Sequence, residues 1–446
     1  MTLEANRKTI LSYVLPSICA MIVSFTYNVV DGIFVGRGVG PNALGAVNLA
    51  VPFTEIMTAL ASMLTIGGGT VMAIRKGRGE YEKANQAFMA SIFLLSLVAA
   101  ALTFIGAVFP CQVARAFGAT ELLLEDTAVY IRWYFLFAIF FTISILGCTF
   151  VRNDGSPGLA FWGMVSGAAA NIFLDWLFIF PLGMGIKGAA IASGLGQIIA
   201  CLVLATHFIR KKGILRFRRF RPEGELCRKV AVRGLPEFVV QLSQPVTIFC
   251  YNQVILRLSG ESGLAAFSAI SYLITIMMGL FFGISQGLQP LIGNSYGAGN
   301  RSHVRYFFRS GLKINLACST LLYLVYFFLG DKALSLFLDN PVLVQSAQAS
   351  LKVYGLAFII ASVSIIYMTY FLSTKRTAQA LVISGARGFV LNSLLIFTLP
   401  VLLGPSWLWY PAIISEVLTM LIAIGLKRHY DTAERLEPAG SPRSLQ

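Results

Sequence analysis

Long apolar runs, separated by short polar or charged segments, recur along the whole chain. A helix needs about twenty mostly apolar residues to cross the hydrocarbon core of a membrane, and twelve runs are long enough. In chain order, these predicted spans one to twelve are residues 11–35, 45–73, 87–110, 129–151, 160–182, 187–208, 232–257, 265–293, 309–330, 353–373, 378–403 and 406–426. The pattern therefore predicts an all-α integral membrane protein with twelve transmembrane helices.

The chain also resembles itself when its sequence is shifted by 220 residues. In that register Pro16 aligns with Pro236 and Gly67 with Gly287. Each half then holds six spans, an even number, so both halves enter the membrane in the same orientation. Repeats of this kind are related by an axis along the membrane normal. We therefore expect two six-helix bundles related by a pseudo-two-fold axis in that direction.

The predicted division of the chain follows from this repeat. Residues 1–206 form the N-terminal bundle, 207–233 a basic linker, 234–427 the C-terminal bundle and 428–446 a tail. Two such bundles leave a cleft, and rocking one against the other would open that cleft to each side of the membrane in turn. The sequence therefore favours a transporter that works by alternating access.

Composition and charge support this interpretation. Hydrophobic residues make up 57% of the chain, charged residues only 12%, and the mean hydropathy is +0.75, whereas soluble domains carry roughly a quarter charged residues. The net charge of +15 would suggest nucleic acid as a partner of a soluble protein. Here, however, the basic residues gather in alternate loops, most densely at 210–233. This positive-inside asymmetry predicts a protein of the cell (inner or plasma) membrane with both termini and the linker cytoplasmic, beside anionic lipid.

Cysteine, histidine and motif patterns disfavour an enzyme. The seven cysteines show no CxxC spacing and the three histidines do not cluster, so neither a disulfide framework nor a Cys/His metal site is expected. The chain contains no HExxH, GxSxG or Walker motif, which argues against metalloprotease, hydrolase and ATPase chemistry. We expect no catalytic residue and no cofactor. A channel stays an alternative, although no symmetric filter sequence is present.

Two carboxylates lie deep in the spans of the first half, where charged groups are costly and usually mark an ion or substrate path. Asp31 lies well inside span one, with Tyr27 one helical turn before it. Span five sets Asn171 and Asp175 four residues apart. Residues four apart share one face of a helix, so each of these two spans offers a carboxylate beside a polar neighbour.

Span six adds Ser193 and Gln197, again four residues apart. Together these side chains predict an oxygen-rich pocket in the first half that suits Na⁺, a hard cation, or a proton. Two carboxylates in such a pocket cannot both ionise cheaply, so one could carry a proton. Glu55, Glu237 and Glu416 also fall within spans. We expect Glu237 near the membrane surface, whereas the other two suit either helix packing or function.

The second half carries amides in place of acids. Tyr251 stands at the position equivalent to Asp31, and Ser393 lies two residues from the position equivalent to Asp175. The side chains expected to shape a substrate cleft are Gln197, Gln241, Gln244, Gln286, Met277 and Phe281. Met and aromatic surfaces adapt to bulky organic molecules, although plain packing is the alternative role. Arg387 is the one deep charge expected in this half, with snorkelling of its side chain toward the membrane surface as the alternative.

Three separated segments resemble the multidrug and toxic compound extrusion (MATE) family. YNVVDGIFVG at 27–36 is similar to the first-helix motif of that family, and FVRNDGSP at 150–157 to the segment after its fourth helix. NIFLDWLFIFPLGMGIKGAAIAS at 171–193 is similar to its fifth-to-sixth helix region. The FVRNDG string points to the DinF-like and MepA-like branch, and the resemblance extends over nearly the whole chain.

The resemblance implies secondary active export of organic, often cationic compounds in exchange for H⁺ or Na⁺. The family's cation site corresponds here to Asp31, Asn171, Asp175 and Ser193, with Tyr27 and Asn153 as further corresponding residues. A Na⁺ ion would bind at the first four of these.

Two positions depart from the family pattern. Trp176 stands where the family often has proline, which puts a local bend of span five in doubt, and Gln244 stands where other branches carry glutamate, which argues against a second cation site. The alternative function is a lipid-linked or polysaccharide precursor flippase, whose groove is typically more basic. Expected partners are small organic substrates and the lipid bilayer, and we expect a monomer.

Overall fold

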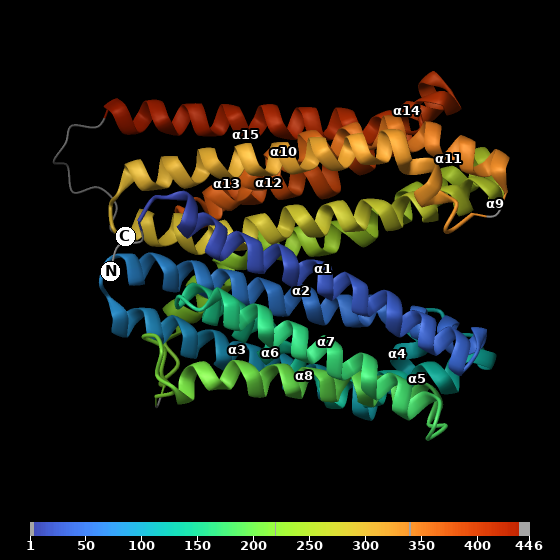
Figure 1. Ribbon diagram of the computed structural model, residues 1–446, viewed down its shortest axis with the longest axis horizontal. Coiled ribbons are helices and arrows are strands. Elements are labelled where there is room, and N and C mark those ends of the chain that lie inside the picture. The colour runs from blue at the N-terminus through green and yellow to red at the C-terminus, as the bar shows by residue number, and fades with distance from the viewer. Residues whose placement is uncertain (1–3, 219, 339, 437–446) are drawn as a thin grey trace. The chain divides into compact units, whose positions relative to one another are not determined.

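The computed structural model describes residues 4–218, 220–338 and 340–436, and these residues are nearly all helical, with no strand (Figure 1). This confirms the predicted all-α class. Residues 428–436 of the predicted tail continue the last helix, and residues 437–446 lie outside the described part of the chain.

Eight helices precede the linker. They are α1 (Arg7–Gly38), α2 (Pro41–Gly77), α3 (Tyr81–Val108), α4 (Pro110–Ala116), α5 (Glu121–Leu136), α6 (Ala138–Asn153), α7 (Pro157–Ile179) and α8 (Gly185–Ile209). After the linker come α9 (Gly224–Gly297), α10 (Arg301–Leu334), α11 (Pro341–Tyr354), α12 (Leu356–Ser373), α13 (Thr377–Gly385), the π-helix η1 (Ala386–Val390), α14 (Leu391–Leu403), the 3₁₀-helix η2 (Pro405–Trp407) and α15 (Tyr410–Leu436). Proline opens α2, α4, α7 and α11, a position where its missing N–H costs no helical hydrogen bond.

Within the described residues, ten helices are long and apolar enough to cross a membrane, and the number is eleven if the bent pair α5 and α6 forms one span. The protein is therefore a multi-pass membrane protein. Predicted span four, 129–151, is not one straight helix, because the chain turns by 52° between α5 and α6. Predicted span 232–257 is helical but is not among these spans; it contains Glu237 and four amides, which lower its hydropathy.

Predicted spans seven and eight join in the single helix α9, which is broken at Gly260. Its φ of 63° and ψ of −159° lie in a region that essentially only glycine occupies. The bend therefore takes place at the one residue type that accepts it without steric strain.

Contacts between Cα atoms divide the protein into two compact units. The first contains the residues up to Leu242 together with Thr275–Gly311 and Leu372–Lys375. The second contains Ser243–Ile274, Leu312–Phe371 and the residues from Arg376 onward. These units follow spatial contacts, so parts of the predicted second half, such as residues 275–311, group with the first unit.

Small residues let helices of the first unit approach closely. A Cβ atom added at Gly67 of α2 would lie 2.0 Å from the carbonyl oxygen of Val230 in α9. One added at Gly234 would lie 1.8 Å from the carbonyl oxygen of Met63. Close backbone approach through small residues is how helices pack in lipid, where no hydrophobic force pushes them together. The start of α9 is thus held against α2.

A buried carboxylate, Asp154, attaches the linker to the first unit. It directly follows α6 and lies 3.0 Å from both Lys76 Nζ and His207 Nε2. Its two oxygens also accept hydrogen bonds from the backbone N–H groups of Ile214 and Leu215, each at 3.1 Å. One side chain therefore joins the end of α2, the end of α8 and the linker.

The residues around Asp154 are tightly packed. A Cβ atom on Gly213 would lie 1.7 Å from Asp154 Oδ2, so glycine is needed at this point of the linker. Burial alone would raise the pKa of Asp154, but the hydrogen bond with His207, the positive charge of Lys76 and the two backbone N–H groups together lower it below its usual value. The ionised form is thus the one that holds the linker.

We predict that Asp154→Asn lowers the free energy of unfolding by about 3 kcal/mol, because it removes a fully buried carboxylate that pairs with Lys76 and accepts from two backbone N–H groups. The measurement is thermal unfolding in detergent at neutral pH. Since the folded state lowers the pKa of Asp154, its stabilisation is present above the unfolded pKa of about 3.9 and fades as the pH falls through the folded value. The difference in the free energy of unfolding between wild type and variant should therefore become smaller at acidic pH.

Glu82→Gln is the matched control, because the Glu82 carboxylate is 81% exposed and pairs at the surface with Arg218 at 2.7 Å. Exposed pairs contribute little, so this variant should unfold like wild type. An Asp154→Asn protein as stable as wild type at neutral pH would show that the carboxylate does not hold the linker.

Candidate functional site

The two predicted aspartates come together in the first unit. Asp31 lies on α1 and Asp175 on α7, two helices that pack along each other, and their carboxyl groups are close enough to interact directly. Asp175 is completely buried, and Asp31 is partly buried. The fold thus places two acids side by side within the membrane-spanning part of the first unit.

Four buried oxygens of this cluster have no hydrogen-bond donor among the described residues. Among the described residues, neither carboxyl oxygen of Asp175 nor Oδ1 of Asp31 receives a hydrogen bond, and the same holds for Oδ1 of Asn171. Asn171 Nδ2 donates to Ser193 Oγ at 3.4 Å, which links α7 to α8. Buried acceptors without donors are costly. A proton on one carboxyl group, or a cation among the oxygens, would remove that cost.

Tyrosines surround the acid pair. Tyr27, one turn before Asp31, interacts electrostatically with that carboxyl group, and so do Tyr130 and Tyr134 of α5. The rings of Tyr130 and Tyr134 stack with their centroids 5.6 Å apart. The sequence analysis did not identify these two as site residues. Their spacing of four within α5 was the available signal, but only the packing of α5 in the first unit brings them to Asp31.

Two other predicted residues of the first half have different neighbours. Gln197 accepts a hydrogen bond from Ser144 of α6. Asn153, at the end of α6, donates through Nδ2 to the carbonyl oxygen of Gly69 at 3.1 Å and accepts from Lys76 at its own carbonyl oxygen. The structure therefore groups Asn153 with the neighbourhood of Asp154, at one end of α6.

The residues predicted to shape a substrate cleft have different partners in the structure. Gln241 donates to Ser62 at 3.3 Å, and Gln286 accepts from Arg152 at 2.9 Å. Met277 and Phe281 of α9 are fully buried, as packing residues are, whereas Gln244 is exposed and belongs to the second unit. The cleft assignment stays a prediction, since these contacts do not gather the residues around one space.

The second unit holds a buried ion pair instead of an acid pair. Arg387 Nε lies 2.6 Å from Glu416 Oε1, and both side chains are largely buried. Arg387 belongs to the π-helix η1, a distortion that is frequent at functional sites. Tyr251, at the position equivalent to Asp31, is buried against Phe267 and Tyr354, and Ser393, two residues from the position equivalent to Asp175, lies near Cys250. Glu416 is thus already neutralised by its partner.

No group of three or more His, Cys, Asp or Glu side chains suited to a metal ion occurs among the residues that the structure describes. The first-unit cluster differs from such a site because it combines two carboxylates with an amide and a hydroxyl. Oxygen donors of this mixed kind suit a hard, weakly held cation.

Comparisons with known proteins agree on one family. A family model described as MatE matches the chain twice, over residues 16–177 and 236–398. The two matches begin 220 residues apart, the same offset at which the sequence resembles itself. A multidrug export protein MepA from Staphylococcus haemolyticus is 24% identical over 425 residues, which is 94% of this chain and 92% of the relative. MepA of Staphylococcus saprophyticus is 22% identical with the same coverage.

Solved structures share the fold. The outward-facing conformation of a multidrug resistance MATE family transporter of the MOP superfamily superposes with a TM-score of 0.90 at 23% identity, covering 96% of this chain and 97% of the other. A MOP superfamily transporter from Pyrococcus furiosus gives the same TM-score, identity and coverage. At this level of identity the likeness concerns the fold, and it agrees with the predicted twelve helices in two bundles.

Proposed function

Because the chain belongs to the MATE family of membrane transporters, we propose that it exports organic, often cationic compounds in exchange for H⁺ or Na⁺. The observation that carries this proposal is the pair of carboxyl groups, Asp31 and Asp175, which α1 and α7 hold together without donors. Relatives over 94% of the chain are multidrug export proteins, which supports drug-like compounds as substrates. Multidrug transporters of this family are in general not enzymes, and we propose no catalytic activity.

The coupling step follows from the charge of the pair. Two adjacent carboxylates away from water repel each other, and one proton bound between them removes that repulsion. Na⁺ could neutralise the pair in a similar way, with Asn171 and Ser193 supplying neutral oxygens. In either case an entering cation changes the net charge at the contact between α1 and α7.

A change of charge at this contact can alter the path of α1. Pro16 lies inside α1, where it removes one backbone hydrogen bond and permits a bend. Close contacts hold the first half of α1 against α9, since a Cβ atom on Gly283 would lie 2.8 Å from the Cα atom of Ile18. We propose that ion entry at Asp31 shifts the outer part of α1 and thereby drives alternating access between the two repeats.

We predict that Asp31→Asn and Asp175→Asn each abolish gradient-driven efflux while leaving expression and folding largely intact. Asparagine keeps the shape of the side chain but removes the charge and the exchangeable proton. The measurement is efflux of a fluorescent organic cation from proteoliposomes under imposed Na⁺ or pH gradients, normalised to the amount of protein. Efflux that responds to only one of the two gradients in the wild-type protein identifies the coupling ion.

Glu237→Gln is the control for this experiment, because it also removes one acid of a predicted span but lies outside the cluster. It should reduce efflux only mildly. Near-normal coupled efflux by both aspartate variants would exclude the proposed coupling mechanism, whereas the family assignment would stand.

We propose that both termini and the linker are cytoplasmic, because the basic residues gather on that side. In a cysteine-free background, a cysteine at Arg221, which is exposed in the linker, should react with a membrane-impermeant maleimide only after cells are permeabilised. Cys111, exposed in α4 just after the end of α3, should react in intact cells when it is restored alone. Labelling of the linker cysteine in intact cells would show that the linker is extracellular and that the proposed orientation is wrong.

A further inference from the structure

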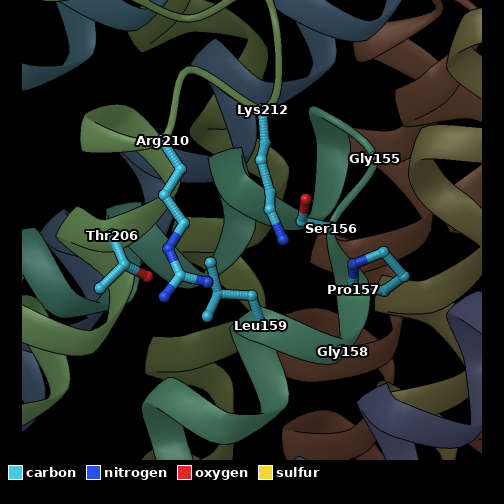
Figure 2. Close-up of a pocket in the computed structure, with 8 residues that line it drawn as sticks. All are labelled: Gly155, Ser156, Pro157, Gly158, Leu159, Thr206, Arg210 and Lys212. Atoms are coloured by element: carbon cyan, nitrogen blue, oxygen red, sulfur yellow. The ribbon is translucent and has the colours of Figure 1, made fainter.

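A cavity of about 290 Å³ lies in the first unit between the start of α7 and the end of α8 (Figure 2). The residues around it that matter for binding are Ser156, Gly158, Leu159, Thr206, Arg210 and Lys212. A water molecule takes up about 30 Å³ of the liquid, so a much larger group fits. The cavity is not the acid pair, because Asp175 lies eighteen residues beyond Pro157 on α7, about 27 Å along the helix.

Both walls of the cavity are fixed helix ends. After α6, Gly155 adopts a φ of 101° and Ser156 N–H donates to the carbonyl oxygen of Val151. After α8, Lys211 adopts a φ of 50° and Lys212 N–H donates to the carbonyl oxygen of His207. This left-handed ending with its backward hydrogen bond is a common way to terminate a helix. It sets where Arg210 and Lys212 leave the backbone, and Asp154 holds the linker that follows.

Two cations point into this cavity. Figure 2 shows the side chain of Lys212 directed toward Ser156 and that of Arg210 directed toward Leu159. Neither side chain has a hydrogen-bond or ion-pair partner among the described residues. Two uncompensated positive charges that converge on one space favour an anion there, and a phosphate group accepts well from guanidinium and ammonium donors.

The rim of the cavity has further donors for an anion. The hydroxyl group of Ser156 caps no N–H group of α7. The backbone N–H groups of Gly158 and Leu159 lie in the first turn of α7, where a helix has no internal acceptors. These hydrogen-bond donors supplement the two cations. Without the cations they would not define an anion-binding site.

The surroundings indicate where the anion comes from. Leu202, Thr206 and Ile209 share one face of α8 with Arg210, since they are spaced by three or four residues. Leu202 is 63% exposed and Ile209 77% exposed, and Trp162, one turn beyond Gly158 on α7, is 61% exposed. Apolar side chains exposed on a membrane-spanning helix face lipid, and tryptophan favours the level of the headgroups. The cations thus stand at the border between lipid tails and water.

We propose that this cavity binds the phosphate group of an anionic membrane lipid, with the acyl chains lying along the exposed face of α8. Basic pockets between membrane-spanning helices are suited to anionic headgroups. The bound lipid would tie the ends of α7 and α8 together beside the linker. This site is independent of the proposed coupling mechanism at the other end of α7.

The test compares the full-length wild-type chain with the double variant Arg210→Gln/Lys212→Gln in non-ionic detergent. Native mass spectrometry counts bound phosphatidylglycerol as its concentration rises, with zwitterionic phosphatidylcholine as the reference lipid. Wild type should prefer phosphatidylglycerol, and the double variant should bind it about tenfold to thirtyfold more weakly, the effect of two basic residues at a membrane surface. Arg210→Lys/Lys212→Arg, which keeps both charges, should retain most of the binding.

The charge-matched control is Arg221→Gln/Arg228→Gln, which removes two exposed charges of residues 207–233 that do not line the cavity. It should bind phosphatidylglycerol like wild type. If the Arg210→Gln/Lys212→Gln variant binds phosphatidylglycerol as tightly as the charge-matched control does, the proposed lipid site is wrong. A separate titration with inorganic phosphate distinguishes the source of the anion: phosphate binding that needs Arg210 and Lys212, without a preference for phosphatidylglycerol, would overturn the lipid assignment.

Discussion

The hydrocarbon of a bilayer offers no hydrogen-bond partner, and this constraint explains most of the architecture. Backbone groups there must pair within their own helix, which accounts for a chain that is helical almost throughout the described residues. Buried charges must find partners too. Asp154 meets Lys76 and His207, and Glu416 meets Arg387. Asp31 and Asp175 face another acid instead, and this departure from pairing is the physical reason to regard their contact as the functional centre.

The helix α7 connects the two places in the first unit where we propose that ions bind. A helix carries partial positive charge at its start and partial negative charge at its end. The start of α7 lies against Arg210 and Lys212, which adds to the attraction for an anion. Asp175 lies in the last turns, four residues before Ile179, where the helix itself disfavours a negative charge. The same dipole thus strengthens the need for a proton or cation at one end and for an anion at the other.

Rigid and deformable segments alternate in a way that suits transport. Backbone contacts through Gly67 and Gly234 leave no room for adjustment between α2 and α9. Interruptions are found elsewhere: Pro16 inside α1, the bend between α5 and α6, and the π-helix that contains Arg387. Motion in a packed protein concentrates at such points, because well-packed contacts are bistable and do not deform continuously. Asp31 of the acid pair lies on α1, the same helix that contains Pro16.

The sequence by itself determined the all-helical membrane fold and the internal repeat, since both depend on residue type and spacing along one chain. It also indicated Asp31, Asn171, Asp175 and Ser193, because a polar group in an apolar run is visible without a structure. Only the tertiary structure decided which residues meet. The sequence did not reveal that Tyr130 joins Asp31, or that Asp154 holds Lys76, His207 and the linker, because these contacts join segments far apart in the chain. The sequence analysis also did not predict the helix breaks at Phe137 and Gly260. An apolar run has the same residue pattern whether tertiary packing bends the helix or leaves it straight.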